Sequence, residues 1–270
     1  MNAATATPHA QVELLALGEA MVEFNQTGDR EGRIWLQGFG GDTSNFAIAA
    51  ARQGARAGYL CALGDDPNGR LLRALWAREG VDASSVRSDA AAFSAIYFVS
   101  HDDAGHHFDF MRAGSAASRM TPADLPRERI AATRVLHLSG ISLAISESAR
   151  ATSLAAIDIA RGAGVRVSFD TNLRLKLWPL ERARAGMREV MAVTDICLPS
   201  LDDMTALTGL AEPDAIVDHC LGTPSAPRRY TPSSTRQCRE ETAAVSPCIF
   251  DCAEAIREAG TILQRLEMRL

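Results

Sequence analysis

Short apolar runs alternate with amphipathic stretches along most of the chain. The apolar runs are bounded by glycine or polar residues and predict buried strands at 12–17, 57–63, 135–138, 165–170 and 196–198. Between them, apolar residues recur at helical spacing and predict helices at 43–53, 68–79, 146–162, 180–191 and from 202. Repeated strand–helix units predict an α/β fold: a doubly wound, mostly parallel sheet with helices on both faces and ligands at the carboxyl ends of its strands.

Two segments break this alternation and predict a second, smaller sheet. A more polar segment at about 33–39 carries scattered apolar residues before a Gly-Gly turn. The segments 93–100 and 106–112 are rich in β-forming residues, and Asp102-Asp103-Ala104-Gly105 joins them as a strong hairpin signal. Because neither segment fits a strand–helix unit, we expect both to form a small β-lid over the ligand site.

The character of the chain changes at about residue 222 and sets the expected domain boundaries. Prolines, serines and threonines crowd 222–247 without a sustained apolar period, whereas 251–270 regains helical spacing. We therefore expect a flexible tail at 1–11 and a partial α/β domain at 12–221. Beyond it we expect a tail at 222–270, disordered to about residue 250 and then helical, where the C-terminal part of the fold is missing or replaced.

Composition narrows the class of partner. Of 270 residues, 47% are hydrophobic and 23% are charged, which is typical of a soluble globular protein. No apolar run approaches the length of a membrane span. With 28 basic and 33 acidic residues, the net charge of -5 gives no general reason to bind nucleic acid or anionic lipid. The first ten residues lack the features of a signal peptide, so we expect a cytoplasmic protein that binds a small molecule.

The first candidate site lies at the start of the predicted helix 43–53. The adjacent glycines Gly40 and Gly41 precede a polar cluster that runs from Asp42 to Asn45. Glycines let a backbone approach a ligand closely, and the amino end of a helix presents free N–H groups. An ordinary loop with a helix cap at Asp42 would have the same residues. Neither GxxxxGK[ST] nor a complete GxGxxG occurs, which argues against a P-loop or a nicotinamide site.

Two further clusters carry candidate chemistry. Asp170-Thr171-Asn172-Leu173-Arg174 directly follows a predicted strand, where an arginine can bind a carboxylate with two hydrogen bonds. On the hairpin, Phe110, Met111 and Arg112 face Tyr97, and an aromatic ring with an arginine can close over a polar substrate. The alternatives are a surface turn for the first cluster and a solvated sheet edge for the second.

Four motifs in order make the chain resemble a known family. They are Gly18-Glu19-Ala20-Met21, Gly40-Gly41-Asp42-Thr43-Ser44-Asn45, Gly64-Asp65-Asp66-Pro67-Asn68-Gly69 and Asp170-Thr171-Asn172-Leu173-Arg174-Leu175-Lys176-Leu177-Trp178. Over about 12–221 the chain resembles the PfkB-type (ribokinase-like) carbohydrate kinases, especially members that act on 2-keto-3-deoxygluconate. The resemblance implies a ribokinase-like fold, ATP and Mg²⁺ as cofactors, an acidic sugar as small-molecule partner, and a possible homodimer through the lid.

The resemblance also implies a role for each matching residue. Sugar hydroxyls would be bound by Gly40, Gly41, Asp42 and Asn45. The lid would close over the substrate with Tyr97, Phe110, Met111 and Arg112. Arg112 and Arg174 would together bind the carboxylate of the keto acid. The ATP side would be formed by Asn172, Ser200 and Asp203, with Asp203 reaching Mg²⁺ through water.

One expected motif is absent. Family members carry Gly-Ala-Gly-Asp near the carboxyl end, where it supplies the anion site and the proton acceptor, and this sequence contains no such run. The resemblance implies ATP-dependent phosphorylation of 2-keto-3-deoxygluconate to its 6-phosphate as the parent function, lost or strongly impaired here, with no catalytic residue assigned. The alternatives are a non-catalytic keto-acid-binding protein or inactive fragment, and a kinase for fructose, ribose or a nucleoside.

The similarity ends abruptly near 220–222. Because a shifted reading frame in GC-rich DNA encodes much alanine, arginine, proline and serine, we hypothesise a frame change at this point. Translation of the other two frames of the gene beyond codon 221 tests the hypothesis, and absence of Gly-Ala-Gly-Asp from both would reject it.

Overall fold

The computed structural model describes residues 12–27, 32–102 and 105–222. The flexible tail expected at 1–11, and the disordered and helical parts expected beyond residue 222, lie outside the described residues. Gly222 itself ends the last described helix, α8 (Pro213–Gly222).

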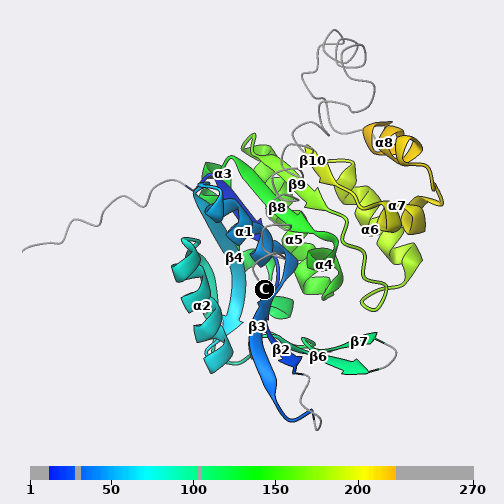
Figure 1. Ribbon diagram of the computed structural model, residues 1–270. Coiled ribbons are helices and arrows are strands. Elements are labelled where there is room, and N and C mark those ends of the chain that lie inside the picture. The colour runs from blue at the N-terminus through cyan, green and yellow to red at the C-terminus, as the bar shows by residue number, and fades with distance from the viewer. Residues whose placement is uncertain (1–11, 28–31, 103–104, 223–270) are drawn as a thin grey trace, which may run out of the picture.

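A parallel sheet of six strands forms the centre of the described fold (Figure 1). Its strand order is β10-β9-β8-β1-β4-β5, and every neighbouring pair is parallel. The strands are β1 (Leu14–Leu17), β4 (Ala57–Gly64), β5 (Asp82–Asp89), β8 (Val135–Ser139), β9 (Arg166–Asp170) and β10 (Ile196–Leu198). The predicted α/β class and parallel sheet are confirmed. The edge strand β5 was not predicted, because it is mostly polar and buries only Val86.

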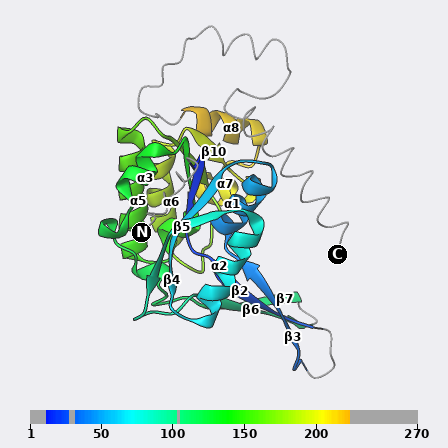
Figure 2. The same cartoon turned by 90° about the vertical axis from the view of Figure 1, so that its left-hand side faces the viewer.

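Helices cover both faces of this sheet, as the alternation predicted (Figure 2). One face packs against α1 (Asp42–Arg52) and α2 (Pro67–Glu79). The other face packs against α3 (Arg127–Ala132), α4 (Gly140–Ala144), α5 (Glu147–Gly162), α6 (Leu180–Met191), α7 (Leu201–Thr208) and α8. Alternate residues of β1 serve the two cores: Leu15 and Leu17 face the α5 side, and Ala16 faces the α1 side. None of the described helices is long and apolar enough to span a membrane.

The lid is a separate sheet of four strands in the order β3-β2-β6-β7. Its strands are β2 (Met21–Gln26), β3 (Trp35–Gly40), β6 (Ile96–Asp102) and β7 (Gly105–Met111). The predicted lid segments are thus confirmed as one small sheet, but β2 was missed. This strand pairs antiparallel with β3 and parallel with β6, so it joins the two predicted segments. Because β1 continues into β2 through Gly18–Ala20, the lid lies at the carboxyl end of β1 (Figure 1).

Candidate functional site

The backbone before α1 fits closely between the lid and the loop from β1 to β2. Gly41 has φ 106°, and a Cβ atom there would lie 2.5 Å from the carbonyl oxygen of Glu19. A Cβ atom on Gly40 would lie 2.5 Å from the ring of Tyr97. Both positions therefore require glycine. The close approach that the Gly-Gly pair predicted is present, and it places Asp42 as the first residue of α1.

Asp42 links α1 to the loop after β9. Its Oδ1 accepts a 2.8 Å hydrogen bond from the backbone N–H of Thr43, and its Oδ2 accepts a 2.8 Å bond from Nδ2 of Asn172. Two residues predicted for different roles, one for sugar and one for ATP, therefore lie in contact. Asn45 lies on α1 as well, and its side chain is exposed.

Buried hydrogen bonds fix the first turn of α1. The hydroxyl of Thr43 lies 2.9 Å from the Tyr59 hydroxyl, and Nε1 of Trp76 donates a 2.9 Å bond to Oγ of Ser44. All four side chains are buried. Because each polar group would be left unpaired if α1 moved, these bonds keep Asp42 in place.

The loop after β9 brings an acidic residue into the site. Oδ1 of Asp170 accepts a 3.2 Å bond from the backbone N–H of Asn172, which adopts a left-handed conformation with φ 30°. Burial raises the pKa of Asp170 to about 6, and the nearby charges of Asp42 and Asp203 add to the increase, whereas the positive charge of Arg174 acts in the opposite direction. Perturbed carboxyl groups of this kind are concentrated at functional sites.

Residues predicted for the ATP side gather where β9 and β10 end. Oδ2 of Asp203 accepts hydrogen bonds from Oγ1 of Thr171, at 3.0 Å, and from the backbone N–H of Leu173, at 3.1 Å. Oγ of Ser200 accepts a 3.1 Å bond from the backbone N–H of Asp203 and so caps α7. The two residues therefore hold the loop after β9 against the start of α7, whatever else they bind.

Arg174 lies at the end of the same loop and is exposed. Its Nη1 donates a 2.8 Å hydrogen bond to the backbone carbonyl of Leu173. Among the residues that the structure describes, Arg174 forms no ion pair with an acidic side chain. Its guanidinium therefore offers donors and a positive charge at this edge of the sheet.

On the lid, aromatic rings and an arginine stack in a row. The rings of Tyr97 and Phe110 stack at 5.4 Å between centroids, and Cζ of Arg112 lies 5.6 Å from the Phe110 centroid. The hydroxyl of Tyr97 donates to Glu23 on the neighbouring strand β2. Met111 is 56% exposed. The predicted lid residues therefore lie together, and Glu23, to which the sequence analysis gave no role, belongs with them.

Arg112 is paired with an acid that the sequence analysis also left without a role. Its Nη2 lies 2.5 Å from Oε2 of Glu19, and the two side chains are 10% and 0% exposed. The prediction treated Arg112 as a free cation for a ligand carboxylate, whereas the structure compensates its charge within the protein. The available signal was one acidic residue in the otherwise apolar stretch from Leu14 to Val22.

Comparison with known proteins identifies the family. The family model described as pfkB family carbohydrate kinase matches residues 11–224. This chain belongs to the PfkB carbohydrate kinases. All four motifs of the sequence analysis fall within the match, and the fold of the described residues is ribokinase-like.

Curated relatives of this PfkB chain differ in the sugar that they are named for. Fructokinase-2 of Solanum habrochaites is 34% identical over 202 residues, which cover 73% of this chain and 61% of the relative. The 2-dehydro-3-deoxygluconokinase of Thermoproteus tenax is 34% identical over 218 residues, which cover 76% of this chain and 64% of the relative. The PfkB chain thus spans less than two thirds of the length of these relatives.

A solved structure shares the fold. The PfkB protein from Polaromonas sp. JS666 superposes with a TM-score of 0.75 at 31% sequence identity, over 79% of this chain and 74% of that one. The ribokinase-like assignment is therefore confirmed by structure as well as by sequence.

The described part of the PfkB chain could bind Mg²⁺ only if most ligands of the ion were phosphate oxygens and waters. Within it, no group of three or more His, Cys, Asp or Glu side chains is arranged to bind a metal ion. Magnesium at phosphate sites commonly has only one or two protein carboxylates and keeps several waters. Asp203 suits such a contact through water, and Oδ1 would make it because Oδ2 already accepts two bonds from the protein.

Proposed function

We propose that this PfkB chain binds 2-keto-3-deoxygluconate where the lid meets the carboxyl edge of the six-stranded sheet. The parent reaction is transfer of the γ-phosphoryl group of ATP, with Mg²⁺, to the terminal hydroxyl, which gives the 6-phosphate. The observation that carries the proposal is Arg174, an exposed cation that forms no ion pair among the described residues, although its charge acts on the Asp170 carboxyl group. A carboxylate ligand could form the direct, charged hydrogen bonds that no acidic side chain makes with this guanidinium.

Residues at the start of α1 and on the lid offer contacts for the rest of the sugar. Asp42 is held by Asn172 and offers carboxylate oxygens as acceptors. The glycines Gly40 and Gly41 let the backbone pack against Tyr97 and Glu19, so that the amino end of α1, which presents free N–H groups, lies beside the lid. The stacked rings of Tyr97 and Phe110 provide an apolar surface for the C–H groups of a sugar.

Phosphoryl transfer needs more than this binding site. Catalysis of that reaction rests on positioning, on stabilisation of charge at the transferred phosphate and on a proton acceptor. The printed sequence contains no Gly-Ala-Gly-Asp, the run that supplies the last two in the family. We therefore propose that the chain as printed binds the keto acid with little or no turnover. In a coupled assay with Mg-ATP, turnover at ordinary kinase rates of about 1 to 100 per second would refute this part.

A neutral sugar is the second candidate, because the relative from Solanum habrochaites is named a fructokinase and because Glu19 compensates Arg112. Titration calorimetry without ATP separates the two candidates. For the keto acid, Arg174→Ala should weaken binding at least tenfold and leave any fructose binding within about twofold, because a charged hydrogen bond is lost with only one ligand. The matched control Arg188→Ala removes an exposed arginine of α6 and should change neither affinity.

Two outcomes would contradict the assignment to a keto acid. Unchanged keto-acid affinity in Arg174→Ala would show that the arginine does not contact the carboxylate. Binding of fructose without binding of the keto acid would favour the neutral-sugar alternative instead.

A further inference from the structure

A fully buried carboxylate lies where the lid joins the six-stranded sheet. The Glu19 side chain is 0% exposed and belongs to the loop from β1 to β2. Burial raises the pKa of Glu19, although the Arg112 cation and the Ser115 hydroxyl act in the opposite direction. A buried carboxylate without compensation is strongly unfavourable, so the placement of these two partners matters to this part of the fold.

Arg112 supplies the compensating charge from the lid. It directly follows β7, and its guanidinium contacts Glu19 and lies 5.6 Å from the centroid of the Phe110 ring. Its Nε and Nη2 are buried and form no hydrogen bond among the described residues, so the contact with Glu19 is an ion pair without hydrogen-bond geometry. Because a guanidinium carries five N–H groups, the ion pair leaves N–H groups that could donate to an oxygen atom of a ligand.

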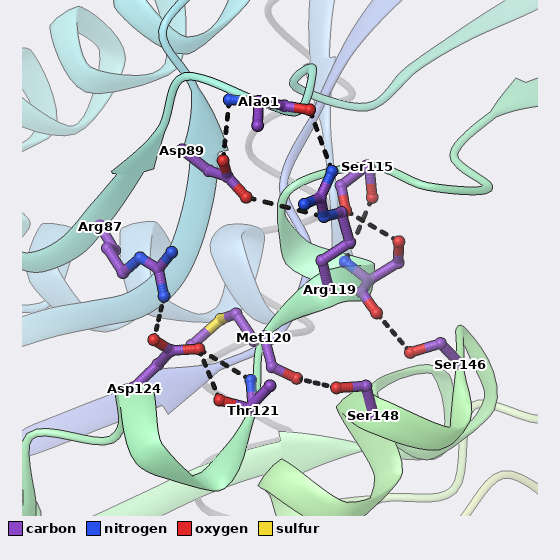
Figure 3. Close-up of polar contacts among 11 residues, drawn as sticks. Arg87, Asp89, Ala91, Ser115, Arg119, Met120, Thr121, Asp124, Ser146 and Ser148 are labelled. Carbon is purple, nitrogen blue, oxygen red and sulfur yellow. Dashed lines mark hydrogen bonds and ion pairs between the residues drawn. The ribbon is translucent and has the colours of Figure 1, made fainter.

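The other partner of Glu19 is fixed by the loop that follows the lid. Oγ of Ser115 donates a 2.7 Å bond to Oε1 of Glu19, and Oγ of Ser118 donates a 2.8 Å bond to the backbone carbonyl of Ser115. Figure 3 shows how this loop is tied to the turn after β5 and to α5. Its further bonds join Arg119 to Ala91, Ser146 to Ser118, and Ser148 to Met120. Hydrogen bonds to two other elements therefore hold in place the loop that donates to Glu19.

The two arginines of the site consequently differ in the charge that they present. Arg112 is in an ion pair and only 10% exposed, whereas Arg174 is exposed and forms no ion pair in the described part of the chain, with only a longer-range effect on Asp170. We propose that Glu19 is a specificity-determining positioning residue, which neutralises Arg112 so that this arginine binds ligand oxygens by hydrogen bonds while Arg174 alone recognises a carboxylate. This inference rests on the proposed sugar site.

Glu19→Gln tests the proposal, because glutamine keeps the shape and can still accept the bond from Ser115. The variant leaves Arg112 as an uncompensated cation, so binding of an anion should improve relative to binding of a neutral sugar. We expect the ratio of the fructose Kd to the 2-keto-3-deoxygluconate Kd, measured by calorimetry, to increase about tenfold over wild type. A merely structural role of Glu19 would change both affinities together. An unchanged ratio in the folded variant overturns the proposal.

A second comparison holds even if Glu19→Gln does not fold. In Arg112→Gln the buried Glu19 loses its cation and should take up a proton, so no free charge appears. The preference for the keto acid over fructose should then change by less than about threefold, whereas Arg174→Gln should reduce it at least tenfold. Equal losses in both variants would mean that Arg112 acts as a free cation, which overturns the proposal.

The outcomes separate this inference from the proposed function. If wild-type protein binds neither ligand, both are refuted. If wild-type protein binds the keto acid and Arg174→Gln reduces this binding, but Glu19→Gln leaves the preference unchanged, only the role of Glu19 is refuted.

Discussion

Asp170→Asn should stabilise the protein at neutral pH. Asp170 is largely buried at the end of β9, and its pKa is raised to about 6 by burial and by the charges of Asp42 and Asp203. In the unfolded chain the same carboxyl group has a pKa of about 3.9. The folded state therefore binds this proton more tightly than the unfolded state, and ionisation of Asp170 destabilises the fold. Asparagine keeps an acceptor for the backbone N–H of Asn172 and removes the charge.

The size of this stabilisation and its pH range follow from the folded and unfolded pKa values of Asp170. A difference of about two units corresponds to about 3 kcal/mol in the free energy of unfolding, fully present above pH 6 and lost progressively as the pH falls from 6 to 4. The free energy of unfolding of Asp170→Asn should therefore exceed that of wild type by up to about 3 kcal/mol at pH 8 and by about half as much at pH 5. Since Asp170 retains some exposure, these values are upper limits.

Urea unfolding of both proteins between pH 5 and pH 8 measures the difference. Asp66→Asn is a control of opposite sign. Burial raises the pKa of Asp66, but hydrogen bonds from Ser94 and Gly69 outweigh burial and the pKa is lowered. This substitution should therefore destabilise the protein at neutral pH, with a smaller effect as the pH falls. A difference between Asp170→Asn and wild type that is zero or negative at pH 8, or that does not shrink toward pH 5, would refute the reasoning.

Three further variants test the fold around the site. Thr43→Val leaves the buried Tyr59 hydroxyl unpaired and should lower the free energy of unfolding by about 1 to 3 kcal/mol. Adding Tyr59→Phe should recover part of this loss, because the unpaired hydroxyl is then removed. Additive losses of the two substitutions in urea unfolding would contradict the pairing. Gly40→Ala places a methyl group 2.5 Å from the Tyr97 ring and should weaken sugar binding at least tenfold in calorimetry; wild-type affinity would contradict it. Leu36 on the lid is 64% exposed, and we propose that it contributes to a lid-to-lid homodimer. Leu36→Asp should then give a monomer in light scattering. A monomeric wild-type protein would refute this proposal.

Elements with a strong period could be predicted from the sequence. The predicted helix 180–191 matches α6, and the predicted strand 57–63 ends one residue before β4 does. In both cases the burial pattern follows directly from the order of apolar and polar residues. The strand β2 has no such pattern, because its last four residues, from Glu23 to Gln26, are only partly buried. Its identity depends on pairing with β3 and β6, which lie elsewhere in the sequence.

In the candidate site, too, local features could be predicted from the sequence and long-range contacts could not. The two glycines before Asp42, and the polar residues after β9, could be found because a turn, a helix start and a strand end are local features. The partner of Tyr97, Glu23, is 74 residues away in the sequence, and the partner of Glu19, Ser115, is 96 residues away. No spacing rule links such positions.

The sequence by itself determined the alternation of strands and helices and the separate lid segments. Only the tertiary structure decided which charges are paired: Arg112 forms a buried ion pair with Glu19, whereas Arg174 forms no ion pair among the described residues. The physical reason is that local structure depends on neighbours along the chain. The ionisation and the binding capacity of a buried group depend instead on which charges the packing of two sheets brings within a few ångströms of it.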